Sequence, residues 1–208
     1  MACSADHAIL TGDSQDRWLD RWLPRLRSAV GDGHVLELGC DDGRDTATLV
    51  QAGFGVIATD ISLEALGSCA TLVPAARLLH HDLRTPMPFA DGEFAAILAS
   101  LCLHYFEWTE TQAMVDEIHR CLRPGGLLLC RLNSTHDFNF GARGHQMLED
   151  NYYAISQRFG ERKRFFDRPA LDKLFGTGWE PISVQEMTIA RYELPKVVWE
   201  AVLLRRHS

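Results

Sequence analysis

Short apolar runs alternate with segments of helical periodicity over the first two thirds of the chain. The runs predict buried strands, and the segments between them carry apolar residues three or four positions apart, which predicts helices. Ser62 is expected to cap the helix after the second strand, and Thr109 with Gln112 the helix after the fourth. This alternation predicts a parallel sheet with helices on both faces. The predicted strands are 34–38, 55–59, 76–80, 94–100 and 127–132.

Another apolar stripe comes before the first strand. Trp18 and Trp22 belong to a set of apolar residues at helical spacing, so the sequence predicts a helix near residues 14–29. Pro24 interrupts this helix and predicts a kink or break, because proline lacks the backbone N–H that a helix interior needs. Residues 1–30 are therefore expected to form an N-terminal helical extension.

The last third of the chain has a different rhythm. Residues 133–166 are rich in Asn, Gly, Arg and aromatic residues, and so long an irregular connection is typical of a lid or binding loop. Asp167 can cap the short helix that follows. Two apolar runs, 182–189 and 196–204, are joined by a short connection and predict an antiparallel pair. We therefore expect a single domain over residues 1–208, with a substrate lid inserted before the terminal helix and hairpin.

Glycines and carboxylates follow three of the predicted strands at the point where each ends. The turn 39–43 opens a helix, Asp60 ends the second strand, and Asp82 lies just past the third. In an open α/β sheet, ligands bind outside the carboxyl ends of the strands. A carboxylate at Asp60 can accept both hydroxyls of an adenosine ribose, and one at Asp82 can accept an adenine amino group. Each residue alone is more typical of a helix cap or a solvated turn, so it is their recurrence that indicates a binding site.

The glycine turn does not match the pattern of nicotinamide dinucleotide-binding proteins. That pattern is GxGxxG, whose third glycine lets the helix pack closely. Counted from Gly39, it requires glycine where this chain has Asp41 and Arg44. A diphosphate would also meet the charges of Asp41 and Asp42 unfavourably. A nucleotide-dependent oxidoreductase is therefore the least favoured hypothesis.

Over residues 34–132 the chain resembles the class I S-adenosylmethionine (SAM)-dependent methyltransferases. The resemblance implies a doubly wound, Rossmann-like α/β fold with a seven-stranded, mostly parallel sheet of order 3-2-1-4-5-7-6, in which strand 7 is antiparallel. A narrower resemblance, to small-molecule enzymes of the tellurite-resistance type, is carried by residues 43–46 and 103–106. The features of the wider family are Glu37-Leu38-Gly39-Cys40-Asp41-Asp42-Gly43, Asp60, His81-Asp82-Leu83, Phe94 to Phe106 and Leu122-Arg123-Pro124-Gly125-Gly126.

The resemblance also implies which residues bind SAM. Gly39 and Gly43 would line its methionine part, Asp60 would hold the ribose, Asp82 with the following leucine would contact adenine, and the backbone of Ala99 would help hold the amino group. The sulfonium and ammonium of SAM suit an acidic pocket. The implied cofactor-binding residues are Glu37, Gly39, Cys40, Asp41, Gly43, Asp60, Ile61, Asp82, Leu83 and Ala99.

Candidates for contact with a methyl acceptor lie after the fourth strand and in the predicted lid. His104 and Tyr105 are expected to orient the acceptor or relay a proton, the histidine because its pKa is near neutrality. The other interpretation is that both pack in the loop. In the lid, arginine can bind a carboxylate or oxyanion, or the aromatic residues only cover the sheet edge. The predicted substrate-binding residues are Asn133, Arg143, Tyr152 and Arg164.

Composition and charge limit the expected partners. The formal net charge is −7, which disfavours a phosphate backbone, so no nucleic-acid partner is expected. Residues 1–142 carry −9 and residues 143–208 carry +2, which fits either drift in surface composition or a weakly basic lid for an anionic substrate. No apolar segment reaches ~18 residues and no signal peptide pattern is present. The cysteines form no CxxC pair and the histidines no HExxH pattern, so we expect a cytoplasmic protein without a metal site or membrane partner.

These observations predict an enzyme that transfers a methyl group from SAM to a small-molecule acceptor and releases S-adenosylhomocysteine. A soft anionic acceptor needs no general base, whereas a hydroxyl does. The alternative is a non-catalytic SAM-binding or regulatory protein that kept the fold, because the family usually has glycine where this chain has Asp41. A side chain there either crowds the cofactor or attracts its ammonium. The acceptor atom and the oligomeric state stay open.

Overall fold

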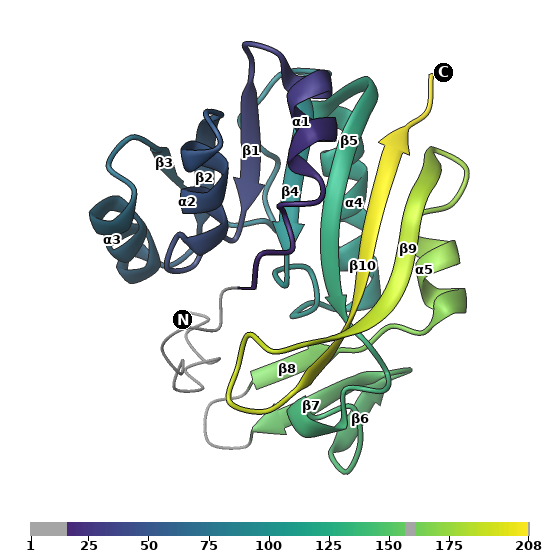
Figure 1. The fold of residues 1–208 in the computed structure, drawn as a ribbon. Helices are drawn as coiled ribbons and strands as arrows, with labels where there is room; N and C mark the ends of the chain where they lie inside the picture. Colours follow the sequence, from purple (N-terminus) through teal and green to yellow (C-terminus); the bar gives the residue numbers. More distant parts are fainter. Residues whose placement is uncertain (1–15, 157–160, 208) are drawn as a thin grey trace.

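The computed structural model describes residues 16–156 and 161–207. The strands of its main sheet are β1 (His34–Leu38), β2 (Gly55–Asp60), β3 (Arg77–His80), β4 (Phe94–Ser100), β5 (Leu122–Asn133), β9 (Trp179–Ile189) and β10 (Lys196–Arg205). Their order is β3-β2-β1-β4-β5-β10-β9 (Figure 1). Neighbours from β3 to β5 are parallel, whereas β10 is antiparallel to both β5 and β9. This confirms the predicted order 3-2-1-4-5-7-6, in which β10 is strand 7.

Helices cover both faces of the main sheet in two apolar layers. They are α1 (Leu23–Val30), α2 (Arg44–Gln51), α3 (Leu63–Leu72), α4 (Trp108–Cys121) and α5 (Arg168–Leu174). One layer packs α4 and α5 against Leu36 and Ile97, and the other packs α1, α2 and α3 against Val35 and Leu98. Successive strand residues face opposite sides, so the apolar residues of β1 and β4 contribute to both layers. None of the described helices is long and apolar enough to span a membrane.

The N-terminal helix is shorter than predicted. Residues 16–22 contain turns, and α1 begins at Leu23 with Pro24 in its first turn. Proline is tolerated there because the missing N–H has no partner inside the helix. The prediction of a helix near 14–29 is therefore wrong over residues 16–22, and Pro24 lies in the first turn of α1 instead of interrupting a longer helix. Trp18 is nevertheless buried, so the apolar stripe marks contact with the core; residues 1–15 lie outside the described part of the chain.

Two of the three predicted helix caps are confirmed. The side chains of Ser62 and Asp167 each accept a hydrogen bond from the backbone N–H three residues later, at 3.2 and 2.9 Å. The capping box predicted from Thr109 is wrong, because α4 is capped by Glu107 together with Glu110. A carboxylate two residues earlier takes the place of the threonine hydroxyl, and the helix begins correspondingly sooner.

Residues 133–166 are more regular than the sequence predicted. After a short 3-10 helix, Phe138–Phe140, they form three antiparallel strands, β6 (Gln146–Glu149), β7 (Tyr152–Ser156) and β8 (Glu161–Arg164). The expectation of an irregular stretch is therefore wrong, because backbone pairing within this small sheet orders the segment. Figure 1 shows the small sheet beyond the carboxyl end of β5, close to the start of β10.

The segment that carries the small sheet is attached to β10 through a buried ion pair. Asp137 accepts hydrogen bonds from Lys196 Nζ at 3.1 Å and from Val197 N at 3.0 Å. The side chains of Asp137 and Lys196 are both 0% exposed. Further along, Phe166 N donates to Asn133 O at 2.8 Å. The two ends of the segment are thus joined to each other and to the main sheet.

Candidate functional site

A cleft of about 760 Å³ lies at the carboxyl edge of the main sheet. Its walls come from the loops after β1, β2, β3 and β4, from the small sheet, and from the β9–β10 connection. The structure brings together ten of the predicted site residues in its lining: Glu37, Gly39, Cys40, Asp41, Asp60, Ile61, Asp82, Leu83, Tyr105 and Tyr152. Their binding roles stay predictions, but their gathering at one edge follows from the parallel strands.

The turn after β1 is shaped by two glycines with left-handed backbones. Gly39 has φ +64°, and a Cβ there would lie 2.5 Å from the Cβ of Cys102. Gly43 has φ +85°, and a Cβ there would lie 2.7 Å from Cys69 Sγ. Only glycine fits such contacts and such backbone angles without strain. The turn therefore lies directly against the loop after β4 and against α3.

Asp41 has a left-handed backbone, the conformation that most favours glycine. Its φ is +49°, in the left-handed region that aspartate enters more readily than most residues. Its N–H donates to Asp60 Oδ2 at 3.1 Å, while Ser62 N donates to Asp60 Oδ1 at 2.8 Å. Two backbone groups thus fix the Asp60 carboxylate, and each of its oxygens keeps a lone pair for a further donor.

The carboxylate of Asp82 is bound by Arg84. The Nη2 atom of Arg84 lies 2.7 Å from Oδ2 and Nε lies 3.0 Å from Oδ1, and these hydrogen bonds lower the pKa of Asp82. An adenine amino group at this carboxylate would share its oxygens with Arg84. The neighbouring His81 is mostly buried, which lowers its pKa, so the imidazole is neutral at pH 7.

Glu37 is buried beneath the glycine turn and is only 2% exposed. Thr46 Oγ1 donates to its Oε2 at 2.5 Å. Burial, followed by the negative charge of Asp45, raises the pKa of Glu37 to about 8. The side chain is therefore mainly protonated at pH 7. In its predicted cofactor-binding role, Glu37 would act as a neutral carboxyl group.

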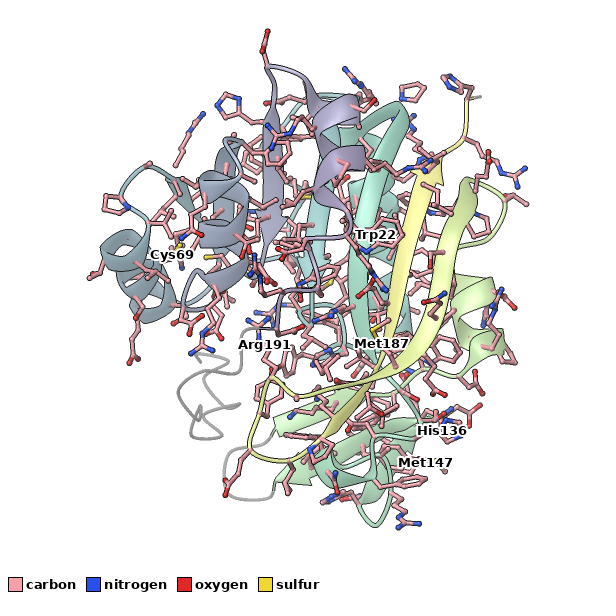
Figure 2. The ribbon with its side chains drawn as sticks, viewed as in Figure 1. Trp22, Cys69, His136, Met147, Met187 and Arg191 are labelled. Atoms are coloured by element: carbon pink, nitrogen blue, oxygen red, sulfur yellow. The ribbon has the colours of Figure 1, made fainter. Side chains whose placement is uncertain are left out.

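The β9–β10 connection also reaches the cleft, where it places Arg191 and Tyr192. Arg191 Nη1 lies 3.5 Å from Asp45 Oδ2, and Asp45 Oδ1 accepts from Trp18 Nε1 at 3.1 Å. Figure 2 shows Arg191 well to the left of Met147, which belongs to β6 of the small sheet. The sequence prediction missed Arg191 and Asp45. The predicted antiparallel strand 196–204 could have indicated Arg191. An antiparallel neighbour of β5 begins at the carboxyl edge of the sheet, so the residues just before it lie near the cleft.

Aromatic side chains line the part of the cleft between the loop after β4 and the small sheet. Tyr105 and Phe106 come from the loop and Tyr152 comes from β7. The hydroxyl of Tyr152 donates to Tyr105 O at 3.2 Å. Arg162 Nη1, from β8, lies 3.7 Å from Glu107 Oε1. These contacts join the small sheet to the loop, and the aromatic surface can exclude water from a molecule bound there.

Six predicted site residues do not line the cleft: Gly43, Ala99, His104, Asn133, Arg143 and Arg164. His104 is fully buried, and its ring centroid lies 4.3 Å from that of Tyr105. Its interpretation as a residue that packs in the loop is therefore favoured over direct contact with an acceptor. In the described ranges no three His, Cys, Asp or Glu side chains are arranged to hold a metal ion.

The predicted lid residues are placed differently from one another. Arg164 is buried and donates to Phe106 O and Asp150 O, each at 3.2 Å, so it holds the small sheet against the loop. The guanidinium of Arg143 lies 4.0 Å from the ring centroid of an exposed phenylalanine. Asn133 is 0% exposed. Of the four predicted substrate-binding residues, Tyr152 alone lines the cleft, and the acceptor contacts of all four stay predictions.

Comparison with known proteins finds similar methyltransferases both by sequence and by structure. A family model described as a methyltransferase domain matches residues 35–126. An uncharacterized methyltransferase of Synechocystis sp. is 36% identical over 106 residues, which is 50% of this chain and 50% of that protein. A tRNA N(3)-methylcytidine methyltransferase of Drosophila melanogaster is 29% identical over 158 residues, 65% of this chain and 47% of that protein.

The fold is similar to solved SAM-dependent methyltransferases. One from Methanosarcina mazei has a TM-score of 0.73 at 17% identity, and the match covers 89% of this chain and 98% of that one. At this identity the likeness concerns the fold alone. The chain spans about half the length of the curated relatives it matches.

Proposed function

We propose that the protein transfers a methyl group from SAM to a small-molecule acceptor and releases S-adenosylhomocysteine. The proposal is supported by the match of residues 35–126 to a methyltransferase domain model and by a fold similar to solved SAM-dependent methyltransferases. The observation that carries the proposal is the Asp60 carboxylate. It faces the cleft at the end of β2, and two backbone N–H groups hold it while its remaining lone pairs stay available for ribose hydroxyls.

The residues around the cleft fit this cofactor. A Cβ at Gly39 would lie 2.5 Å from the Cβ of Cys102, so only glycine lets the turn pack this closely against the loop after β4. The methionine part of SAM would lie beside this turn. Asp60 and Ile61 would hold the ribose, and Asp82 with the neighbouring leucine would contact adenine. The carboxylates of the lining suit the sulfonium and ammonium, because an acidic environment stabilises positive charge.

The chemistry asks little of the protein beyond positioning. When bound, SAM supplies a methyl group already activated by the positive sulfur. The chain's own residues must hold the acceptor in line and exclude water, and alignment alone can contribute about 7 kcal/mol or more. Tyr105, Phe106 and Tyr152 form the wall that would do this. His104 acts behind them as a positioning residue, since its ring packs on Tyr105.

A small acceptor is favoured over a nucleic acid by charge. The net charge is −7, and acidic side chains from Asp41 to Glu110 line the cleft, so a phosphodiester chain would be repelled. The similarity to a tRNA methyltransferase is the observation that favours the second candidate, a tRNA acceptor. The two acceptor classes are distinguished by assaying methyl transfer to a small-molecule library and to total tRNA. Methylation of tRNA alone would overturn the small-molecule proposal.

The first experiment is a calorimetric titration of the purified protein with SAM and S-adenosylhomocysteine, with NADH as the control ligand. We expect micromolar binding of the first two and no binding of NADH. Absence of binding by SAM and S-adenosylhomocysteine would contradict the proposal. SAM binding without turnover on either acceptor class would instead support the alternative of a non-catalytic SAM-binding protein, for which Asp41 is the motivating residue.

A further inference from the structure

Three arginines line the cleft, and Arg191 differs from the other two. Arg84 forms a close ion pair at 2.7 Å with the carboxylate two residues before it. Arg162 is 55% exposed at the rim. The side chain of Arg191 is only 13% exposed, yet its nearest carboxylate oxygens, on Asp45 and Asp16, lie at 3.5 and 3.9 Å. Close charge-assisted hydrogen bonds are about 2.7–2.9 Å long, so these contacts are long.

Both carboxylates next to Arg191 already have another donor. Asp45 Oδ1 accepts from Trp18 Nε1 at 3.1 Å, and Asp16 Oδ2 is bound by Arg131. Within the described residues, the 3.5 Å contact to Asp45 is the one hydrogen bond that Arg191 makes. A guanidinium has five N–H donors in a planar fork. Most of this fork is therefore available to a ligand in the cleft that Arg191 lines.

Arg191 lies at the glycine-turn end of the cleft. Its partner Asp45 follows Gly43 by two residues in the first turn of α2, and its charge also acts on the nearby Glu37. In the proposed binding mode this end takes the methionine part of SAM, which carries the one carboxylate of the cofactor. A carboxylate placed among Asp41, Asp45 and their acidic neighbours would be repelled without a cation beside it.

We propose that Arg191 binds the carboxylate of the cofactor's methionine part, and that Asp45 and Asp16 are positioning residues that hold its guanidinium. This inference rests on the proposed SAM binding and extends the cofactor site to the terminal hairpin. The planar fork of arginine suits a carboxylate, which accepts two parallel N–H bonds. A lysine at this position would keep the charge and lose the paired geometry.

The test compares two ligands by calorimetry: S-adenosylhomocysteine and its decarboxylated analogue, S-adenosyl-3-thiopropylamine. The measured quantity is the ratio of the analogue's Kd to that of S-adenosylhomocysteine. For Arg191→Ala we expect this ratio to fall by about tenfold to a hundredfold, the range for one charge-assisted interaction. The Kd of the analogue itself should change by less than about twofold, because it lacks the group that Arg191 binds. Arg191→Lys should give an intermediate ratio.

The matched control is Arg168→Ala, which removes an exposed arginine of α5 that pairs with Asp172 away from the cleft. It is expected to leave the ratio unchanged. An unchanged ratio in Arg191→Ala, or equal weakening of both ligands, would overturn the inference while leaving the proposed function intact. Failure of the wild type to bind either ligand would contradict the proposed function instead. If circular dichroism shows that Arg191→Ala is unfolded, Arg191→Gln and Arg191→Lys carry the same comparison.

Discussion

At the scale of single residues, three carboxylates around the cleft differ in state because their immediate partners differ. Glu37 is buried, so it is mainly neutral at pH 7. Asp82 is bound by Arg84, which lowers its pKa and keeps it negative. Asp60 has two backbone N–H groups as partners and retains acceptor capacity toward the cleft. The acidic side chains near the ends of β1, β2 and β3 therefore differ in protonation and in the hydrogen-bond donors that they already accept.

Glu37→Gln is expected to remove part of the pH dependence of stability. The folded pKa of Glu37 is about 8 against 4.5 for the free side chain. Its contribution to the free energy of unfolding is thus fully present below pH 4.5 and is lost as the pH rises toward 8, because the unfolded chain ionises first. The loss is up to about 1.4 kcal/mol per pH unit. Urea unfolding at pH 5 and pH 8 should show a smaller difference for the variant than for the wild type.

The matched control for this measurement is Glu180→Gln on the exposed edge strand β9. It changes the same chemical group outside the core and should keep the wild-type pH dependence. A pH dependence of Glu37→Gln equal to that of the wild type would show that Glu37 is ionised in the folded protein.

Asp60→Asn is expected to weaken binding of S-adenosylhomocysteine by about 1.5–3 kcal/mol, the range for hydrogen bonds to a charged group. Asparagine keeps an oxygen for one backbone N–H but replaces the second acceptor with a donor. Because the ribose is common to S-adenosylhomocysteine and its decarboxylated analogue, both affinities should fall together, which separates this effect from that of Arg191. The exposed Asp172→Asn serves as the control. If folded Asp60→Asn binds S-adenosylhomocysteine with wild-type affinity, Asp60 does not bind the ribose.

Residues next to a strand end could be predicted from sequence, and residues brought in by long-range contacts could not. Asp60 and Asp82 were found because each follows an apolar run. Arg191 reaches Asp45 across 146 positions of sequence, and no local pattern indicates such a contact. The protonation of Glu37 was likewise missed, since it depends on burial beneath a turn rather than on its neighbours in sequence.

At the scale of elements, helix ends could be predicted where a side chain bonds to a nearby backbone N–H. Ser62 and Asp167 cap their helices as predicted, because a side chain three residues before an N–H needs no distant partner. The small sheet was missed for the opposite reason. Its strand β8 is four residues long and highly charged, yet Lys163 and Arg164 are each 3% exposed. Charged residues indicate exposed positions only when no partner from elsewhere makes their burial tolerable.

The buried ion pair of Asp137 and Lys196 is expected to hold the small-sheet segment to β10. Asp137→Ala removes the carboxylate at 3.1 Å from Lys196 Nζ and should cost about 3–5 kcal/mol, because the buried ammonium then lacks this opposite charge. The double variant Asp137→Ala with Lys196→Met should recover most of that loss, since no buried charge remains. Urea unfolding of the single and double variants measures both effects. A double variant no more stable than Asp137→Ala would argue against an ion pair as the cause.

At the scale of the whole molecule, the strand order could be predicted, and the long-range contacts at the glycine-turn end of the cleft could not. The alternation of strands and helices, with the family resemblance, implied the sheet order that the structure confirms. Those contacts join three segments that are distant in sequence, because Trp18, before the first helix, and Arg191, in the β9–β10 connection, both contact Asp45 at the start of α2. A TM-score of 0.73 at 17% identity shows that this fold persists while side chains change, so the fold alone does not name the acceptor.

The charge of the whole molecule leads to a prediction that separates SAM from S-adenosylhomocysteine. The protein carries a net charge of −7 and its cleft is lined by carboxylates, while SAM has one more positive charge than its product. Attraction between exposed charges is screened by salt, with a Debye length of about 10 Å at 0.1 M and about 3 Å at 1 M. Raising sodium chloride from ~0.05 M to ~0.5 M should therefore weaken SAM binding several-fold more than product binding.

Calorimetric titration of both ligands at the two salt concentrations measures this difference, and choline chloride in place of sodium chloride controls for a specific effect of sodium. Low salt should then favour release of product and entry of SAM, because the sulfonium charge is lost when the methyl group is transferred. Equal salt dependence of the two ligands would mean that the local groups around the sulfur, rather than the field of the acidic molecule, distinguish cofactor from product.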